Sequence, residues 1–147
     1  MGYWGTSGSD QVVNVLCYDA WGFPIDTYYT VTFVNGINVL GVAGAALAYV
    51  WAHAPASASY IPTSTYSFNS TGGTNSITRS GTGNYTLHLP GLAVDNGHVQ
   101  VTAYGSGANR CKVGYWFASG SELLVNVQCF TVAGAPVDTL FAASYTR

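Results

Sequence analysis

The three cysteines are the side chains whose spacing predicts chemistry most directly. Cys111 and Cys129 are placed symmetrically about Gly120, so a hairpin folded about that glycine sets them opposite each other. It sets Val113 opposite Val127 on the same face, because the positions share parity. Directly opposed strand positions are close enough to be bridged. We predict a Cys111–Cys129 disulfide, which implies an oxidising compartment; two buried free thiols are the alternative.

Cys17 has no partner in this pairing. One interpretation is that the chain is cut from a longer array, which leaves a free buried thiol. The other is that Cys17 pairs with another molecule, as an odd cysteine in a secreted protein can.

The acids and histidines do not form a recognisable active site. His53, His88 and His98 are far apart in the sequence, and no Gly-x-Ser-x-Gly elbow accompanies them. No His-x-His or Cys-x-x-Cys spacing suggests zinc. Calcium at Asp19 or Asp26 is an alternative for which few oxygen ligands are evident. We predict a protein that is not an enzyme, with no metal and no cofactor.

Exposed aromatic rings are better candidates for a binding surface. Trp21 and Phe23 lie at a predicted hairpin tip, where rings can stack on sugars or pack on a protein partner. Trp21 folding back on the neighbouring loop is the alternative. Trp51, Tyr60 and Tyr66 are a second candidate platform, around a Pro-containing loop, with core packing as the alternative for Trp51.

An internal repeat organises the chain. Residues 2–35 align without gaps to residues 114–147, and 14 of the 34 positions are identical. Self-similarity at a fixed offset is typical of tandem modules. We therefore predict two units: residues 1–35 are the C-terminal third of one module, and residues 36–147 are a complete module.

The hairpin about Gly120 also predicts which way the repeated aromatics point. It places Tyr115 opposite Val125, on the face that carries the cysteines. By parity Trp116 points outward, and so does Trp4, its repeat equivalent.

Strand patterns are dense. Apolar and polar residues alternate with period two over 13–17, 29–33, 85–89 and 99–103. The Asp-Asn-Gly of 95–97 predicts a hairpin turn between the last two of these strands. The fold class predicted is all-β, an antiparallel β-sandwich that is Ig-like or related, with an N-terminal two-strand partial repeat.

Composition excludes several classes of function. Only 7% of the 147 residues are charged, and four Lys and Arg are too few for a phosphate-binding surface, so we predict no nucleic acid partner. The uncharged run 31–52 has the length of a bilayer span. Asn and Gly residues interrupt it, however, and two or three strands joined by turns are the better interpretation, so we predict no membrane span. No signal peptide is recognisable at Met1.

Several segments together resemble a known repeat. They are residues 48–52, 66–70, 97–105, 110–113 and 125–130, with Arg79, Gly81, Gly83 and Tyr85 between them. They are similar to the repeat module of secreted, multi-repeat bacterial proteins of unknown function. The resemblance implies an extracellular β-rich module without catalytic residues.

These observations lead to one main functional expectation. A third of a module has apolar strand faces that must be covered, and a neighbouring chain can supply the cover by strand exchange. We expect an extracellular or cell-surface structural or adhesive module whose partners are other copies of itself, in a homo-oligomer or fibre. The alternative is a carbohydrate-binding module that binds a surface glycan through the exposed aromatics.

Overall fold

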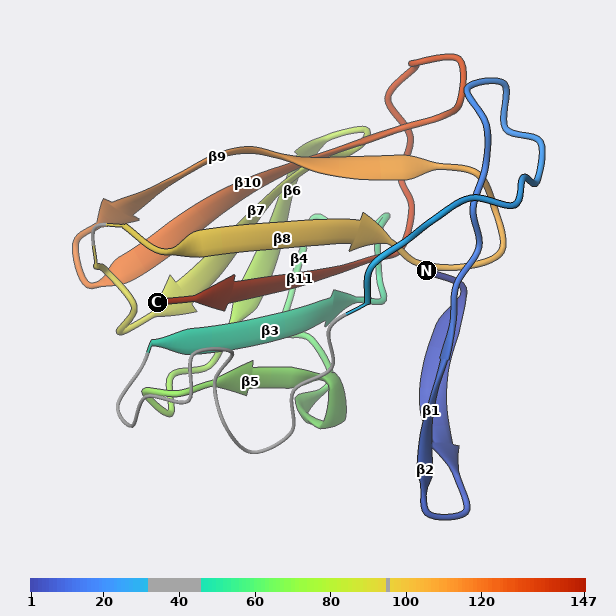
Figure 1. Cartoon of the computed structure of the whole chain (residues 1–147). Coiled ribbons are helices and arrows are strands. Elements are labelled where there is room, and N and C mark those ends of the chain that lie inside the picture. The colour runs from blue at the N-terminus through green and yellow to red at the C-terminus, as the bar shows by residue number, and fades with distance from the viewer. Residues whose placement is uncertain (32–45, 95) are drawn as a thin grey trace.

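The computed structural model describes residues 1–31, 46–94 and 96–147, and these residues form an all-β protein (Figure 1). Every strand pairing among them is antiparallel, as predicted. The helical structure in this part of the chain is one 3-10 turn, η1 (Ser64–Tyr66). It contains no helix long and apolar enough to cross a membrane.

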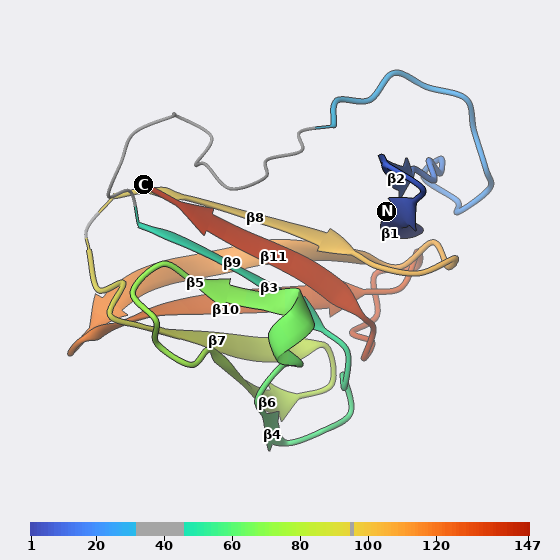
Figure 2. The same ribbon diagram turned by 90° about the horizontal axis from the view of Figure 1, so that it is seen from below.

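Residues 46–147 form two sheets that face each other, and we call this part the module (Figure 2). One sheet has the order β4 (Ser59–Tyr60), β6 (Ser76–Gly81), β7 (Asn84–Pro90), β10 (Glu122–Phe130), β9 (Arg110–Ser119). The other has the order β5 (Ser67–Asn69), β3 (Leu47–Ala52), β11 (Phe141–Thr146), β8 (His98–Ala103). β8 and β9 are consecutive in the chain, and each forms an edge of its sheet.

The core lies between the two sheets because each sheet turns its apolar alternate positions inward. In β7 the inward residues are Tyr85, Leu87 and Leu89, and all three are buried, as the period-two pattern predicts. The other strands contribute Ala48, Val50, Ala52, Ile77, Val99, Leu123, Val125, Val127, Cys129, Phe141, Ala143 and Tyr145.

The hairpin predicted at 95–97 is wrong. β7 pairs with β6 and β10, whereas β8 pairs with β11 in the opposite sheet. The connection between β7 and β8 carries Leu92 into the core, where only 1% of its surface is exposed. Burial of this leucine directs the chain across the core from one sheet to the other. Residue 95 lies outside the described residues.

The register of β9 and β10 confirms part of the predicted pairing and corrects the rest. Cys111 opposes Cys129, but Trp116, and not Tyr115, opposes Val125. The cause is a bulge at Gly114, which adds one residue to β9 and moves every later side chain to the other face.

The predicted pairing of Val113 with Val127 is confirmed. Trp4 likewise opposes Val13. The outward orientation expected for Trp116 and Trp4 is therefore wrong in both copies of the repeat.

Residues 1–31, which we call the leading segment, lie beside the module. β1 (Tyr3–Ser7) and β2 (Asp10–Asn14) pair in a hairpin of their own, next to the end of β8 (Figure 1). The strand predicted over 13–17 stops at Asn14. Residues 29–31 are not in a strand, and the rest of the strand predicted over 29–33 lies outside the described residues. So does most of the run 31–52, of which the last six residues form β3.

Candidate functional site

The two copies of the repeat share a hairpin with the same register and a similar turn after it, but β2 ends at Asn14 and residues 29–31 are not in a strand. The turn after β2 is closed by a bridge between Tyr18 and Pro24, and the turn after β10 by a bridge between Phe130 and Pro136. The glycine in each of these turns has the same φ of 88°, a left-handed value that favours glycine. The sequence repeat is therefore also a structural repeat.

The copies differ in what covers them. β10 lies between β7 and β9, whereas β2 pairs with β1 alone among the described strands. Phe141 is fully buried, but its counterpart Tyr29 is 63% exposed. Ala143 is 6% exposed, and its counterpart Val31 is 48% exposed. Side chains that the module buries at these repeat positions are open to solvent in the leading segment.

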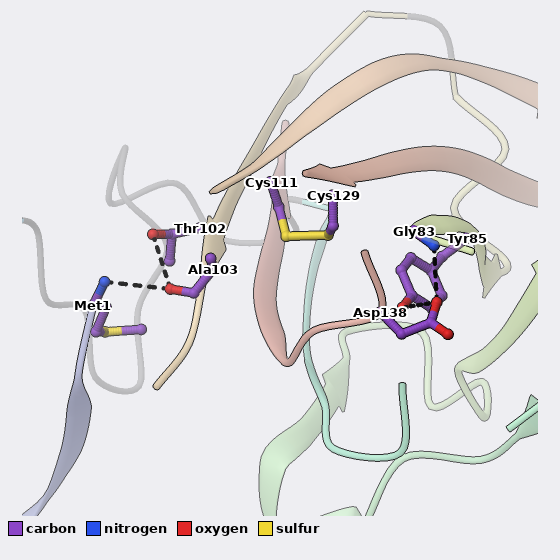
Figure 3. The surroundings of a disulfide bond; sticks show 8 residues. All are labelled: Met1, Gly83, Tyr85, Thr102, Ala103, Cys111, Cys129 and Asp138. Atoms are coloured by element: carbon purple, nitrogen blue, oxygen red, sulfur yellow. Dashed lines mark hydrogen bonds between the residues drawn. A yellow bond between two sulfur atoms is a disulfide. The ribbon is translucent and has the colours of Figure 1, made fainter. Parts of the chain in front are cut away.

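The predicted disulfide is confirmed. Cys111 and Cys129 are bonded between β9 and β10 (Figure 3). Cys17 is the repeat counterpart of Cys129, and it is a free, half-buried thiol. Cys17 thus occupies, in the leading segment, the position that Cys129 occupies in the module.

Asp138 fastens the second copy of the repeat to strands β6 and β7 and the turn between them. Its carboxylate accepts hydrogen bonds from Arg79 at 2.7 and 2.9 Å, from the Gly83 amide at 2.8 Å and from the Tyr85 hydroxyl at 3.0 Å (Figure 3 shows the last two). The bond from Arg79 is the main cause that lowers the pKa of Asp138 to about 2. Burial and the bond to Asp138 raise the pKa of Tyr85, so its hydroxyl stays a donor.

Asp26 is the counterpart of Asp138, and it is exposed. Asp138 caps a turn by accepting the backbone N–H of Gly83. Arg79 anchors the turn between β6 and β7 by donating to Thr82 at 3.3 Å as well as to Asp138.

The leading segment contacts the module at a few points. The Gly105 amide donates to the Met1 carbonyl at 3.1 Å, and the Met1 nitrogen lies 3.3 Å from the Ala103 carbonyl oxygen (Figure 3). The Tyr18 hydroxyl donates to the Ser106 carbonyl at 2.7 Å. These bonds hold the base of the hairpin against the residues that follow β8.

A pocket of about 200 Å³ separates the leading segment from the module beside these bonds. Leu16 lines it on one side and Cys111 on the other. The leading segment therefore rests on the module without a continuous packed interface.

An aromatic contact also holds the leading segment against the module. The ring of Trp4 lies edge-on to Trp51 of β3, Tyr66 of η1 and Tyr104 after β8, with centroid distances of 6.5, 6.0 and 5.1 Å. We call Trp51, Tyr66 and Tyr104 the aromatic socket. Edge-to-face pairs of this kind stabilise a contact beyond the area they bury.

The five aromatic residues predicted as a contact surface fall into two groups. Trp21 and Phe23 are 77% and 68% exposed on the turn after β2, as expected. The Asp19 carboxylate accepts the backbone N–H groups of both residues at 2.9 Å, which holds the turn rigid.

The second group spans both sheets: Trp51 and Tyr66 lie on the outer face of the four-stranded sheet, whereas Tyr60 is in β4 of the five-stranded sheet and packs against the core. The rings of Trp51 and Tyr66 pack edge to face, with 5.0 Å between their centroids. Tyr60 joins them through His53, whose ring lies 5.5 Å from Trp51 and 5.3 Å from Tyr60. Trp51 is half-buried on the side of β3 that faces away from the core, so it does not pack in the core.

Sequence reasoning missed one arrangement of side chains that resembles a proton relay. On the outer face of the five-stranded sheet, His88 lies 3.1 Å from the Thr78 hydroxyl and 3.2 Å from the Glu122 carboxylate. The three residues are far apart in the sequence, and only strand pairing brings them together. The backbone N–H groups of β7 and β10 are used within the sheet, so they cannot stabilise an oxyanion there. The arrangement connects three strands.

The described residues contain no cluster of three or more side chains suited to holding a metal ion. In comparisons with protein-family models, with curated proteins and with solved structures, nothing matched this chain.

Proposed function

We propose that this chain is an extracellular or cell-surface structural module, an Ig-like or related β-sandwich, that assembles head to tail by strand exchange. In the assembly, residues 2–31 of one chain occupy the position of residues 114–143 in the module of the next. One observation supports this most strongly: Tyr29 and Val31 of the first copy are exposed at repeat positions where the module buries Phe141 and Ala143.

The module of a neighbouring chain offers the chemistry that the leading segment lacks. Once residues 114–143 are displaced, the module has a free edge of β7 for β2, and its Arg79 and Tyr85 can bond Asp26 as they bond Asp138. The Cys17 thiolate can attack Cys111, forming a Cys17–Cys111 bond and releasing Cys129 as a thiol, so this exchange needs no oxidant. Burial of Tyr29 would add stability, because full burial of a large apolar side chain contributes about 1.5–3 kcal/mol.

Exchange changes the total buried area little, because one segment replaces another of the same fold. Sequence differences therefore decide which segment binds. Leu123 is 1% exposed in the module, and the leading segment has Gln11 at that position, so the chain's own segment is preferred. The leading segment binds when that segment is loosened or absent.

Cysteine chemistry gives the test. Cys129→Ser loosens the chain's own segment and frees Cys111. Under mild oxidation we expect a ladder of oligomers joined by Cys17–Cys111 bridges, which peptide mapping by mass spectrometry identifies. The control Cys17→Ser/Cys129→Ser should give no such ladder. Adding Asp26→Ala to Cys129→Ser should reduce the amount of this ladder, because the inserted leading segment then lacks the carboxylate that Arg79 and Tyr85 of the next chain would bond.

Two outcomes contradict the proposal. Bridges of Cys17 with Cys17, or of Cys111 with Cys111, would show random collision. A bridge between Cys17 and Cys111 within one chain would show that the pocket closes locally and no exchange occurs.

A carbohydrate-binding role is the second candidate, supported by the exposure of Trp21 and Phe23 on a rigid turn. A glycan array with the wild-type chain should then show signals that Trp21→Ala removes. Tyr28→Ala is the matched control, because Tyr28 is fully exposed outside this turn. Equal signals from Trp21→Ala and the wild type would exclude this surface.

A further inference from the structure

The two repeated hairpins present one tryptophan in the same way. Trp4 on β1 opposes Val13 on β2, and Trp116 on β9 opposes Val125 on β10. Each tryptophan is preceded by the same two residues, Gly-Tyr, in both hairpins. The backbone around Trp116 therefore has the same strand pairing as the backbone around Trp4.

The surroundings of the two tryptophans differ. Trp4 is covered by the aromatic socket, whereas Trp116 is 40% exposed. β9 is an edge strand, with β10 as its one partner among the described strands. Its neighbours Tyr115 and Phe117 are also exposed, at 57% and 49%. Tyr115 and Phe117 lie on the opposite face of β9, 6.0 Å apart between ring centroids, so of these three rings Trp116 alone is on the face that Trp4 uses in the first hairpin.

We propose that Trp116 binds the aromatic socket of a second copy of this chain, in the way that Trp4 binds the socket within its own chain. The repeat predicts that Trp4 belongs to the end of one module, and on that prediction its contact with Trp51, Tyr66 and Tyr104 joins consecutive modules. Trp116 is the residue that extends this contact to the next module.

The contact between chains is weaker than the contact within one chain. The Tyr18 hydroxyl supports the Trp4 contact by donating to Ser106. The counterpart of Tyr18 is Phe130, which has no hydroxyl. Trp4 therefore keeps Trp116 of another copy out, and the socket accepts Trp116 when Trp4 is absent or displaced. This inference rests on the repeat and does not require strand exchange.

Removal of Trp4 tests the proposal. Sedimentation velocity should show Trp4→Ala self-associating at concentrations at least tenfold lower than the wild type. Trp4→Ala/Trp116→Ala should return to wild-type behaviour. Trp4→Ala/Phe117→Ala is the matched control, because Phe117 is similarly exposed on the next position of β9, and it should still associate.

The empty socket of Trp4→Ala could also bind other copies non-specifically. A mixing experiment distinguishes this from binding of Trp116. Trp4→Ala/Trp116→Ala offers an open socket, and the wild type offers a free Trp116, so the pair should form a complex. The same double variant mixed with Trp116→Ala should not. Equal association in both mixtures, or none in either, would overturn the proposal. An intact Cys111–Cys129 bridge in the complex separates this contact from strand exchange.

A gain of affinity gives an independent check. Phe130→Tyr in the Trp4→Ala background restores the hydroxyl that the second copy of the repeat lacks. We expect it to tighten self-association by a further threefold or more. Unchanged or weaker association would show that Trp116 does not sit in the socket as Trp4 does.

Discussion

The side-chain amide of Asn126 fills the space that a side chain on Gly114 would occupy. A Cβ placed on Gly114 would overlap the Asn126 oxygen, and the Asn126 nitrogen donates to the Tyr85 carbonyl at 3.3 Å. The leading segment repeats the relationship, since a Cβ on Gly2 would overlap the Asn14 oxygen. This pair lies at the bulge in β9, beyond which Trp116 takes the face that Tyr115 would otherwise have.

Gly114→Ala should destabilise the module. The added methyl must displace Asn126, which is buried and bonded to β7, and overpacking of this kind costs about 1–3 kcal/mol. Urea denaturation followed by tryptophan fluorescence measures the change. Gly107→Ala is the control, because a Cβ there meets no atom within 4 Å, and it should change the free energy of unfolding little. Equal effects of the two changes would contradict this account.

Asp138→Ala should destabilise the module strongly, by about 2–4 kcal/mol, because hydrogen bonds to a charged group are lost and the buried Tyr85 hydroxyl loses its acceptor. The same change at its repeat counterpart, Asp26→Ala, should have little effect in the single chain because Asp26 is exposed. Thermal melts of the two variants compare them directly. A similar loss from both would show that the leading segment is fastened as firmly as the module.

The stability of the module should fall in acid. Asp138 has a pKa of about 2 in the folded protein and an ordinary value of 3.8 when free. Its contribution is therefore fully present above about pH 4 and is lost as the pH falls toward 2. Urea denaturation at pH 7, 4 and 2.5 should show this decline. Asp138→Asn should decline less over the same range, and an equal decline would assign the effect to other groups.

Reduction of the Cys111–Cys129 bridge should lower the free energy of unfolding by about 3 kcal/mol, because the bridge closes a short loop in the unfolded chain. Denaturation with and without dithiothreitol measures the loss. Cys17→Ser should leave the difference unchanged, since Cys17 is free. A variant that responded to dithiothreitol differently would show that Cys17 takes part in the native bridge.

The fold class and the disulfide could be predicted from the sequence because their signals are local. Tyr85, Leu87 and Leu89 alternate with polar residues whatever the rest of the chain does, and Cys111 and Cys129 are symmetric about a turn. The turn that carries Trp21 was recognisable for the same reason.

Other features depend on residues that meet only in the folded chain. The sequence alone determined that this protein is built of antiparallel strands with a repeated end, since period-two alternation and self-similarity need no partner. Only the tertiary structure decided that Asp138 meets Arg79 across 59 positions of sequence and that Trp4 meets the aromatic socket. The bulge at Gly114 belongs with these, because one extra residue reverses every side chain beyond it, and its position depends on how Asn126 packs.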